Sequence, residues 1–256
     1  MERFLRESTA VAQVELIKLA RDPTELVSRA VQPVLWLVVF GQVLAHVHGI
    51  YTGEIGYLAF ITPGILAQSV LFSGIFYGIA VIWERDLGVV HKLLVSPARR
   101  SSLVFGKAIS AGFRGLVQAV VIYLIAIAMH VEIRLDPQAM LGVLGSVLLG
   151  SAIFSTFSLI VACIVKTRER FMGIGQVLTM PMFFASNAIY PLDLMPGWLR
   201  VIAQLNPLTY LVDVLRGFMI PGGETVHGYA DDFTILLAVF LVLLAVAVRL
   251  YPTLAE

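Results

Sequence analysis

Charged and apolar side chains are interleaved at helical spacing in residues 84–97, and this short segment is well suited to bind a partner protein. Leu87, Val90 (or His91) and Leu94 would share one face of a helix that charged residues surround. A proline follows and would end the helix, because proline disfavours helical backbone at the residue before it. An apolar ridge flanked by charges suits docking into a groove of a second protein. The spacing is equally compatible with a solvated, charged loop, so both interpretations stay open.

The chain lacks the residue patterns of common hydrolases. Gly106-Lys107 is followed by Ala108, with no glycine five residues before it, so the loop that cradles the phosphates of ATP is absent. No His-Glu-x-x-His motif, nucleophile elbow or pair of carboxylates inside an apolar run occurs. His46 and His48 lie two residues apart, but no third ligand stands nearby, which favours an interfacial role. We therefore expect no catalytic site, no metal site and no cofactor in this chain.

Flexible and aromatic side chains gather in two of the apolar runs. Pro181 removes a backbone hydrogen bond and predicts a kink. The Met and aromatic side chains around it adapt well to varied apolar ligands. A simpler interpretation is that these side chains face lipid or fill the core. The candidate ligand-contacting residues are Gln68, Phe72, Phe76, Met180, Phe183, Phe184 and Asn187.

The elements that must position these residues belong to a chain with the composition of a membrane protein. Of its 256 residues, 59% are hydrophobic and 14% are charged, against about 25% charged in a soluble domain. This composition excludes a soluble globular protein and a disordered chain. Cys163 is the single cysteine, which excludes a secreted disulfide scaffold. The net charge of +1 gives no argument for nucleic acid as a partner.

Six apolar runs approach the roughly 20 residues that a helix needs to cross a bilayer core of about 30 Å. We therefore predict an all-α integral membrane protein with six transmembrane helices, forming a single domain over residues 1–256. The predicted spans are residues 30–47, 57–83, 103–129, 139–165, 171–190 and 233–250.

Two further segments are predicted to lie at the membrane surfaces. Residues 4–22 form an amphipathic pattern, so residues 1–29 are interpreted as a cytoplasmic interface helix and not as a signal peptide. Residues 191–232 are predicted to be an extracytoplasmic helical region that follows a broken fifth span. Asn206-Pro207 cuts an apolar stretch there into pieces short enough for re-entrant or interfacial helices. One more, poorly formed span is the alternative.

The distribution of charge predicts the orientation. About 14 Lys and Arg residues fall on the side of the N-terminus and about 3 on the other side. Because cytoplasmic loops are enriched in these residues, both termini of this multi-pass protein are expected in the cytoplasm, and the protein in the cytoplasmic (inner) membrane.

Within the predicted spans, three features have two interpretations each. Arg114 is either a functional charge or, as we favour, an arginine whose head reaches the inner headgroups. Gly74-x-x-x-Gly78 and Gly142-x-x-x-Ser146-x-x-x-Gly150 permit close helix approach. For both glycine motifs, packing inside the chain is favoured over a dimer interface.

Several short motifs, in a fixed order, together cover most of the chain. With the six-span layout, they resemble the permease subunits of ABC-2 type exporters, in the daunorubicin-resistance-type and nodulation-type group. Each motif alone is weak, and none is specific to a substrate. The motifs are Trp83-Glu84-Arg85-Asp86-Leu87-Gly88, Leu94-Val95-Ser96-Pro97 followed by Arg100 and Gly106-Lys107, Tyr190-Pro191-Leu192, Met195-Pro196-Gly197-Trp198-Leu199, and Asn206-Pro207-Leu208-Thr209-Tyr210 followed by Asp213-Val214-Leu215-Arg216.

This resemblance implies partners and a mechanism. Such permeases pair as two copies, a homodimer or two related chains, and dock two ATP-binding cassette ATPase subunits that hold ATP and Mg. Substrates of this group are amphipathic or lipid-linked, such as a drug, glycolipid or polysaccharide, and pass between lipid-embedded spans. The second and fifth spans, with the ligand-contacting candidates named above, would flank that path. The residues that would meet the ATPase as a coupling helix over residues 84–97 are Glu84, Arg85, Asp86, Leu87 and His91.

The residues alone leave two other functions open. One is a secondary transporter or channel that is not coupled to ATP, and the other is a membrane scaffold without transport. Ion-coupled carriers usually place ionisable residues near the middle of the membrane. No Asp or Glu lies in the middle of any predicted span, which counts against proton coupling.

Overall fold

The protein is helical throughout the part of the chain that the computed structural model describes. This part comprises residues 6–11, 13–14, 17, 31–45, 55–95, 100–165 and 167–255, and no strand occurs within it. The expected all-α architecture is therefore confirmed for these residues. His46, His48 and Ser96-Pro97 lie outside the described residues, as does most of the predicted interface helix.

Among the described residues, four helices are long and apolar enough to cross a membrane. At about 1.5 Å per residue, each exceeds the bilayer core of about 30 Å. They match the predicted second, third, fourth and sixth spans, the last continuing into the 3-10 turn η3 (Tyr251–Ala255). The four helices are α4 (Tyr57–Asp86), α6 (Arg100–Ala128), α7 (Pro137–Ile164) and α11 (Tyr229–Leu250).

The predicted first and fifth spans form shorter helices. Val31–Ala45 is one short apolar helix, with a π-helical segment η1 (Trp36–Gly41) followed by α3 (Gln42–Ala45). The fifth span becomes α8 (Arg168–Phe184), which has 17 residues and begins with charged side chains. An all-helical membrane protein is thus established, and the count of six spans stays a prediction.

Helix α7 lies at the centre and packs against α4, α6, α11 and the shorter helix α10 (Pro207–Met219). Glycines allow these close approaches: a Cβ on Gly74 of α4 would lie 2.6 Å from that of Phe154 on α7. Gly142 and Gly150 of α7 face Phe218 and Leu211 of α10 in the same way. The interpretation of both glycine motifs as internal packing is therefore confirmed.

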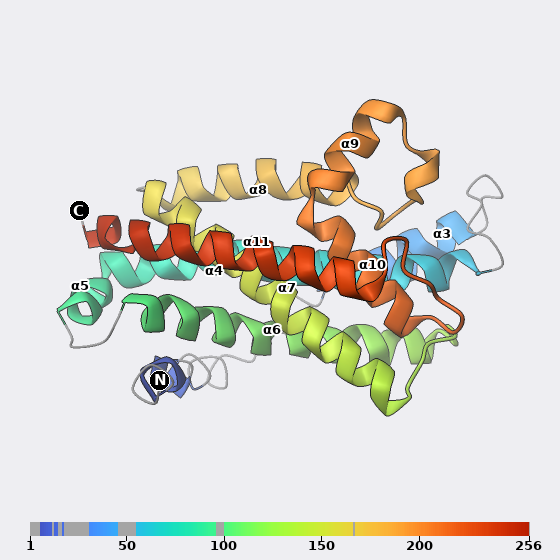
Figure 1. Cartoon of the computed structure of the whole chain (residues 1–256), viewed down its shortest axis with the longest axis horizontal. Helices are drawn as coiled ribbons and strands as arrows, with labels where there is room; N and C mark the ends of the chain where they lie inside the picture. The colour runs from blue at the N-terminus through green and yellow to red at the C-terminus, as the bar shows by residue number, and fades with distance from the viewer. Residues whose placement is uncertain are drawn as a thin grey trace.

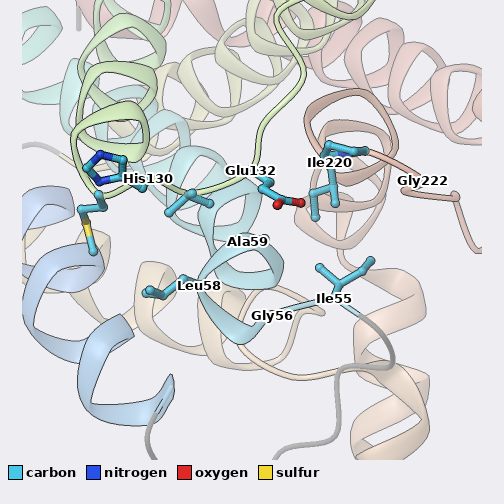
Figure 2. A pocket seen from close by; sticks show the side chains of 11 residues that line it. Ile55, Gly56, Leu58, Ala59, His130, Glu132, Ile220 and Gly222 are labelled. Carbon is cyan, nitrogen blue, oxygen red and sulfur yellow. The ribbon is translucent and has the colours of Figure 1, made fainter.

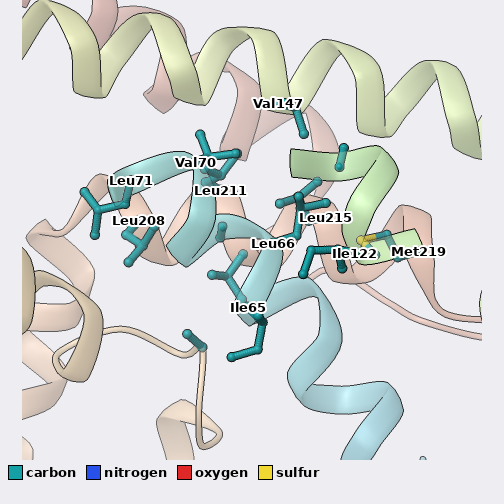
Figure 3. Close-up of a cluster of buried hydrophobic side chains, with 14 of the residues drawn as sticks. Ile65, Leu66, Val70, Leu71, Ile122, Val147, Leu208, Leu211, Leu215 and Met219 are labelled. Carbon is teal, nitrogen blue, oxygen red and sulfur yellow. The ribbon is translucent and has the colours of Figure 1, made fainter. Parts of the chain in front are cut away.

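The main core is a cluster of aliphatic side chains where α4, α6, α7 and α10 meet. Figure 3 shows the α10 leucines beside α4 residues, with Val147 of α7 above them. The leucines and isoleucines of this cluster are fully buried, so the four helices form one packed unit. The labelled members are Ile65, Leu66, Val70, Leu71, Ile122, Val147, Leu208, Leu211, Leu215 and Met219.

The fifth apolar run is broken, as predicted, but not at its proline. Pro181 lies in the last turn of α8, which continues to Phe184 before the chain turns through residues 185–190. Beyond the turn come η2 (Leu192–Leu194), α9 (Gly197–Leu205) and α10. The predicted interruption at Asn206-Pro207 is confirmed, because α9 ends at Leu205 and α10 begins at Pro207.

Several short helices and the first and last described residues lie toward one or the other end of the elongated molecule. Figure 1 shows α5 (Val89–Leu94), the first described residues and the C-terminus toward one end, with α3 and α9 toward the other. At the first end the N-terminal residues pack on α6, where a Cβ on Gly106 would lie 2.7 Å from the carbonyl oxygen of Ser8. The predicted docking segment and the predicted extracytoplasmic region thus occupy opposite ends.

Candidate functional site

The corner between α4 and α5 contains the predicted docking segment. Gly88 has φ of +71°, a left-handed conformation that favours glycine, and it turns the chain from the end of α4 into α5. Val90 is fully buried and anchors α5 to the bundle, whereas His91 is exposed. The predicted short helix is therefore present as α5, with Val90 rather than His91 on its inner face. Leu87 does not share that face as predicted, because it lies in the turn before α5 and is exposed.

Ion pairs connect this corner to two other helices. The Glu84 carboxylate lies 2.5 Å from the ammonium of Lys107 on α6. Asp86 is 2.7 Å from Arg168 at the start of α8, whose guanidinium also lies 3.4 Å from the ring centroid of Trp83. A displacement of the α4–α5 corner would therefore act directly on α6 and α8.

The five predicted docking residues divide into an outward and an inward set. Leu87 is 70% exposed, and His91 is also exposed. Arg85 and Asp86 are partly exposed and paired with each other at 3.0 Å. The side chain of Glu84 is only 12% exposed and turns toward Lys107, so it supports the corner from within.

Arg114 lies inside the protein and does not reach the headgroups, which corrects the interpretation we favoured. The residue is 6% exposed, and its guanidinium carbon lies 5.1 Å from the ring centroid of Tyr77 on α4. The ammonium of Lys107 lies 5.7 Å from the same ring. The electron-rich face of Tyr77 attracts both cations between α4 and α6, in addition to the Glu84–Lys107 pair.

Two of the ligand-contacting candidates, Gln68 and Asn187, lie at one interface. Gly64 of α4 is so close to the turn after α8 that an added Cβ would lie 2.3 Å from the carbonyl oxygen of Ala188. Gln68 is one turn further along α4, and Asn187 precedes Ala188. Both side chains are buried, and neither amide has a hydrogen-bond partner among the described residues. Buried amides without partners are unusual and mark a candidate polar contact for a ligand.

The aromatic and Met candidates do not converge in this arrangement. Phe183 is fully buried, with its ring centroid 5.5 Å from that of Trp36. Phe72 and Phe76 are partly exposed and contact each other, with centroids 6.0 Å apart. Met180 is also partly exposed, and Phe184 is exposed. Their assignment to a substrate path stays a prediction.

Side chains of α10 and of its N-cap residue, Asn206, form hydrogen bonds to the backbone at the end of α8 and in the turn after it. The Asn206 amide donates to the carbonyl oxygens of Met182, at 2.6 Å, and Ala185, at 2.9 Å. Its Oδ1 accepts from the backbone N–H of Leu208 and so caps α10. Arg216 donates to the carbonyl oxygen of Asn187 at 2.7 Å. These donors satisfy backbone groups of the α8 end and the following turn, as an interrupted helix in a membrane requires.

A cavity of about 750 Å³ opens at the end of the molecule opposite α5. It lies between the start of α4, the loop after α6 and the loop after α10, and Figure 2 shows Glu132 and Ile220 among the side chains that line it. His130 lines it with φ of +56°, unusual for a residue other than glycine. No local pattern predicts this cavity, because its walls come from three distant segments.

The sequence reasoning also missed a cluster of Asp213, His227 and Asp232, whose ligand atoms lie within 4.8 Å of one another. Asp213 belongs to α10, His227 to the following loop and Asp232 to the first turn of α11. A carboxylate inside the apolar stretch around Asp213 was the one local signal. The long separations to the other two residues match no metal motif.

Comparison with known proteins gives a consistent result. The ABC-2 type transporter family matches residues 6–220. A putative transport permease, ycf38, of Cyanophora paradoxa is 31% identical over 215 residues, covering 83% of this chain and 74% of the relative. The probable doxorubicin resistance permease DrrC of Mycobacterium tuberculosis is 27% identical, covering 81% and 74%. The daunorubicin resistance permease DrrB1 of Streptomyces coeruleorubidus is 26% identical, covering 90% and 80%. This chain belongs to the ABC-2 type transporter family.

Proposed function

We propose that this chain is the membrane-spanning permease subunit of an ATP-binding-cassette exporter. It would move an amphipathic or lipid-linked substrate outward across the cytoplasmic membrane, while a separate subunit hydrolyses ATP. The observation that carries this proposal is the family match over residues 6–220, which contains the α4–α5 corner and the broken α8. The chain would act as a transport subunit and not as an enzyme.

The α4–α5 corner is the proposed docking site for the ATPase. Leu87 and Val95 offer exposed apolar surface there, and His91 offers a polar contact. The pairs Glu84–Lys107 and Asp86–Arg168 would carry a movement of this corner to α6 and α8. The exporter would contain two ATPase subunits, with ATP and Mg, and a second permease that is another copy or a related chain.

The proposed topology has six spans and both termini in the cytoplasm. Val31–Ala45 and α8 would be the first and fifth spans, although both are short. The 17 residues of α8 extend about 25 Å at 1.5 Å per residue, and the turn at 185–190 would complete the depth. The exposed residues of α9 and the loop after α10 would then lie on the outer surface, in one domain with the helices.

The proposed substrate is drug-like, because relatives of this chain are named for doxorubicin and daunorubicin resistance. Gln68 and Asn187 would supply polar contacts, since both amides are buried without partners among the described residues. Phe72, Phe76, Met180, Phe183 and Phe184 would supply apolar contacts once the α8 side of the bundle moves. Two variants, Asn187→Ala and Phe183→Ala, test this path. The measurement is the export of doxorubicin from loaded vesicles.

Docking is tested with a matched pair of variants in the purified complex with the cognate ATPase. Leu87→Asp and Leu194→Asp place the same charge at exposed leucines, 70% and 56% exposed, at opposite ends of the molecule. Loss of one apolar anchor at an interface should weaken ATPase binding about tenfold for Leu87→Asp. Leu194→Asp should bind as wild type does. Equal binding by both variants would refute docking at the corner.

The same preparation separates the exporter from an ATP-independent transporter or channel. An exporter moves doxorubicin only when ATP and the ATPase subunit are both present. Transport by the chain alone, driven by an ion gradient, would support the second class. Ion-coupled carriers usually place ionisable residues near the middle of a membrane-spanning helix. Asp213 lies in the short helix α10 and Asp232 in the first turn of α11, so neither position favours proton coupling.

A further inference from the structure

Three potential metal ligands converge where α10, the loop after it and α11 meet. Asp213, His227 and Asp232 each place a ligand atom within 4.8 Å of the other two. The Nδ1 atom of His227 lies 3.3 Å from Oδ2 of Asp213 and 3.6 Å from Oδ1 of Asp232. Tetrahedral zinc with ligand bonds of about 2.0–2.1 Å places neighbouring ligand atoms about 3.4 Å apart. Both separations are therefore close to those of a tetrahedral site.

The two carboxylates are buried, with exposed fractions of 0%. Oδ2 of Asp213 accepts from the backbone N–H groups of Val226, at 2.8 Å, and His227, at 3.3 Å. Neither oxygen of Asp232 has a hydrogen-bond partner within the described ranges, and the same holds for Oδ1 of Asp213. A carboxylate removed from water without partners is costly, so Asp232 in its ionised form requires a positive partner.

The nearby guanidinium does not fill that role. Arg216 lies one turn after Asp213 on α10, but it donates to the carbonyl oxygen of Asn187 and lies 3.9 Å over the ring of Phe60. Its charge balances one carboxylate in the low-dielectric interior. With the imidazole neutral and both carboxylates ionised, one negative charge is left among these four described residues, and either a bound cation or a proton shared by the two carboxylates cancels it.

Protonated His227 could also supply the charge, but it satisfies the geometry less well. Nδ1 carries a single hydrogen and can donate fully to one carboxylate. Its nearer acceptor is Oδ2 of Asp213. Asp232 would then keep both oxygens without a hydrogen bond. A cation bound between all three groups contacts both carboxylates at once.

We propose that Asp213, His227 and Asp232 bind one divalent transition-metal ion, with Zn²⁺ as the best match. Imidazole nitrogen and carboxylate oxygen are established zinc ligands, and three protein ligands leave a fourth position for water. The backbone N–H groups on Asp213 would orient that carboxylate as outer partners. The ion would fasten the loop after α10 to the start of α11.

Metal binding is tested on the purified full chain in detergent after removal of metals with a chelator. Titration calorimetry with ZnCl₂ should give one Zn²⁺ per chain for the wild type. Asp232→Asn and His227→Ala should bind at least about tenfold more weakly, as expected when a ligand is lost. Asp231→Asn is the matched control, because it makes the same change at the exposed neighbouring residue and should bind as wild type does.

A second measurement needs no variant and so does not depend on how a mutant folds. Co²⁺ bound to the wild-type chain should give the intense visible absorption of a tetrahedral site, and equimolar Zn²⁺ should abolish it. The proposal is overturned if the stripped wild type takes up no Zn²⁺, or if Asp232→Asn and His227→Ala bind as tightly as Asp231→Asn. In that case Asp213 and His227 form a simple ion pair. Neither measurement involves ATP or transport, so its failure would leave the proposed function untouched.

Discussion

The two ends of the molecule pair their carboxylates in opposite ways. At the α4–α5 corner, Glu84 and Asp86 each have a cation from a neighbouring helix, Lys107 and Arg168. At the other end, Asp213 and Asp232 are buried together, and the guanidinium of Arg216 is held against Asn187 and a ring. The corner is electrostatically complete within this chain. The outer cluster is not, and the proposed docking corner and the proposed cation site rest on this contrast.

The largest effect is expected from removing the cation that completes the corner. Lys107→Ala leaves Glu84 buried without its partner, which should destabilise the fold by about 3 kcal/mol. Arg85→Ala, at an exposed pair, should cost less than about 1 kcal/mol. Thermal unfolding in detergent measures both. If the two variants unfold at the same temperature, the Glu84–Lys107 pair does not stabilise the corner.

The outer end offers a fully paired polar group for comparison, Asn206. Asn206→Ala removes donors to two carbonyl oxygens and the cap of α10, so a loss of about 2–3 kcal/mol is expected. Asn206→Ser keeps a capping oxygen and should recover about 1 kcal/mol of it. The unfolding temperatures of the three proteins give the order. A serine variant no better than alanine would mean that the cap contributes nothing.

A smaller effect of opposite sign is expected at His130. Val131 donates to the carbonyl oxygen of Ala126 and His130 to that of Ile127, the pattern of a left-handed helix end where glycine is usual. His130→Gly should therefore stabilise the chain by up to about 1 kcal/mol. Ala128→Gly, inside the helix, should destabilise by a similar amount. Lower unfolding temperatures for both variants would argue against strain at His130.

The smallest effect concerns an exposed ion pair at the outer end. Arg134, 2.9 Å away, and the N–H of Ala139 hold the pKa of Asp136 below its usual range. A lowered pKa in the folded state gives stability that is present above the ordinary value of about 3.9 and is lost as the pH falls through the folded value. Wild type should therefore unfold at a higher temperature than Asp136→Ala at pH 7, and the gap should shrink at acid pH. A gap independent of pH would exclude this contribution.

Much of the helical organisation was predictable from local patterns. Charge beside a long apolar run located the end of α4, and the spacing of Leu87 and Val90 indicated α5. Asn206-Pro207 marked the boundary between α9 and α10, because both residues favour the start of a helix. The family was predicted from the same motifs and is confirmed. Six spans, cytoplasmic termini and the docking residues stay predictions.

Tertiary contacts decided the rest. The periodicity left Val90 and His91 as alternatives, and only packing against the bundle placed Val90 inside. The fifth apolar run ends after Phe184 rather than at Pro181, because Asn206, from a distant segment, supplies donors for the carbonyls exposed there. Asp213, His227 and Asp232 meet through a loop whose path no periodicity encodes. Arg114 was expected to reach the inner headgroups, but its guanidinium lies over the ring of Tyr77 on α4, a contact that the sequence alone does not reveal.

The single amide of Asn206 also makes two helix ends dependent on each other. Met182 and Ala185 carry its acceptors near the end of α8, and Leu208 donates to it from the first turn of α10. If one end unwinds, the other loses its partners, and because Asn206 is buried, water does not readily replace them. The two ends therefore belong to one cooperative opening unit. Their amide hydrogens should exchange with solvent together, at a common rate, whenever this part of the bundle opens.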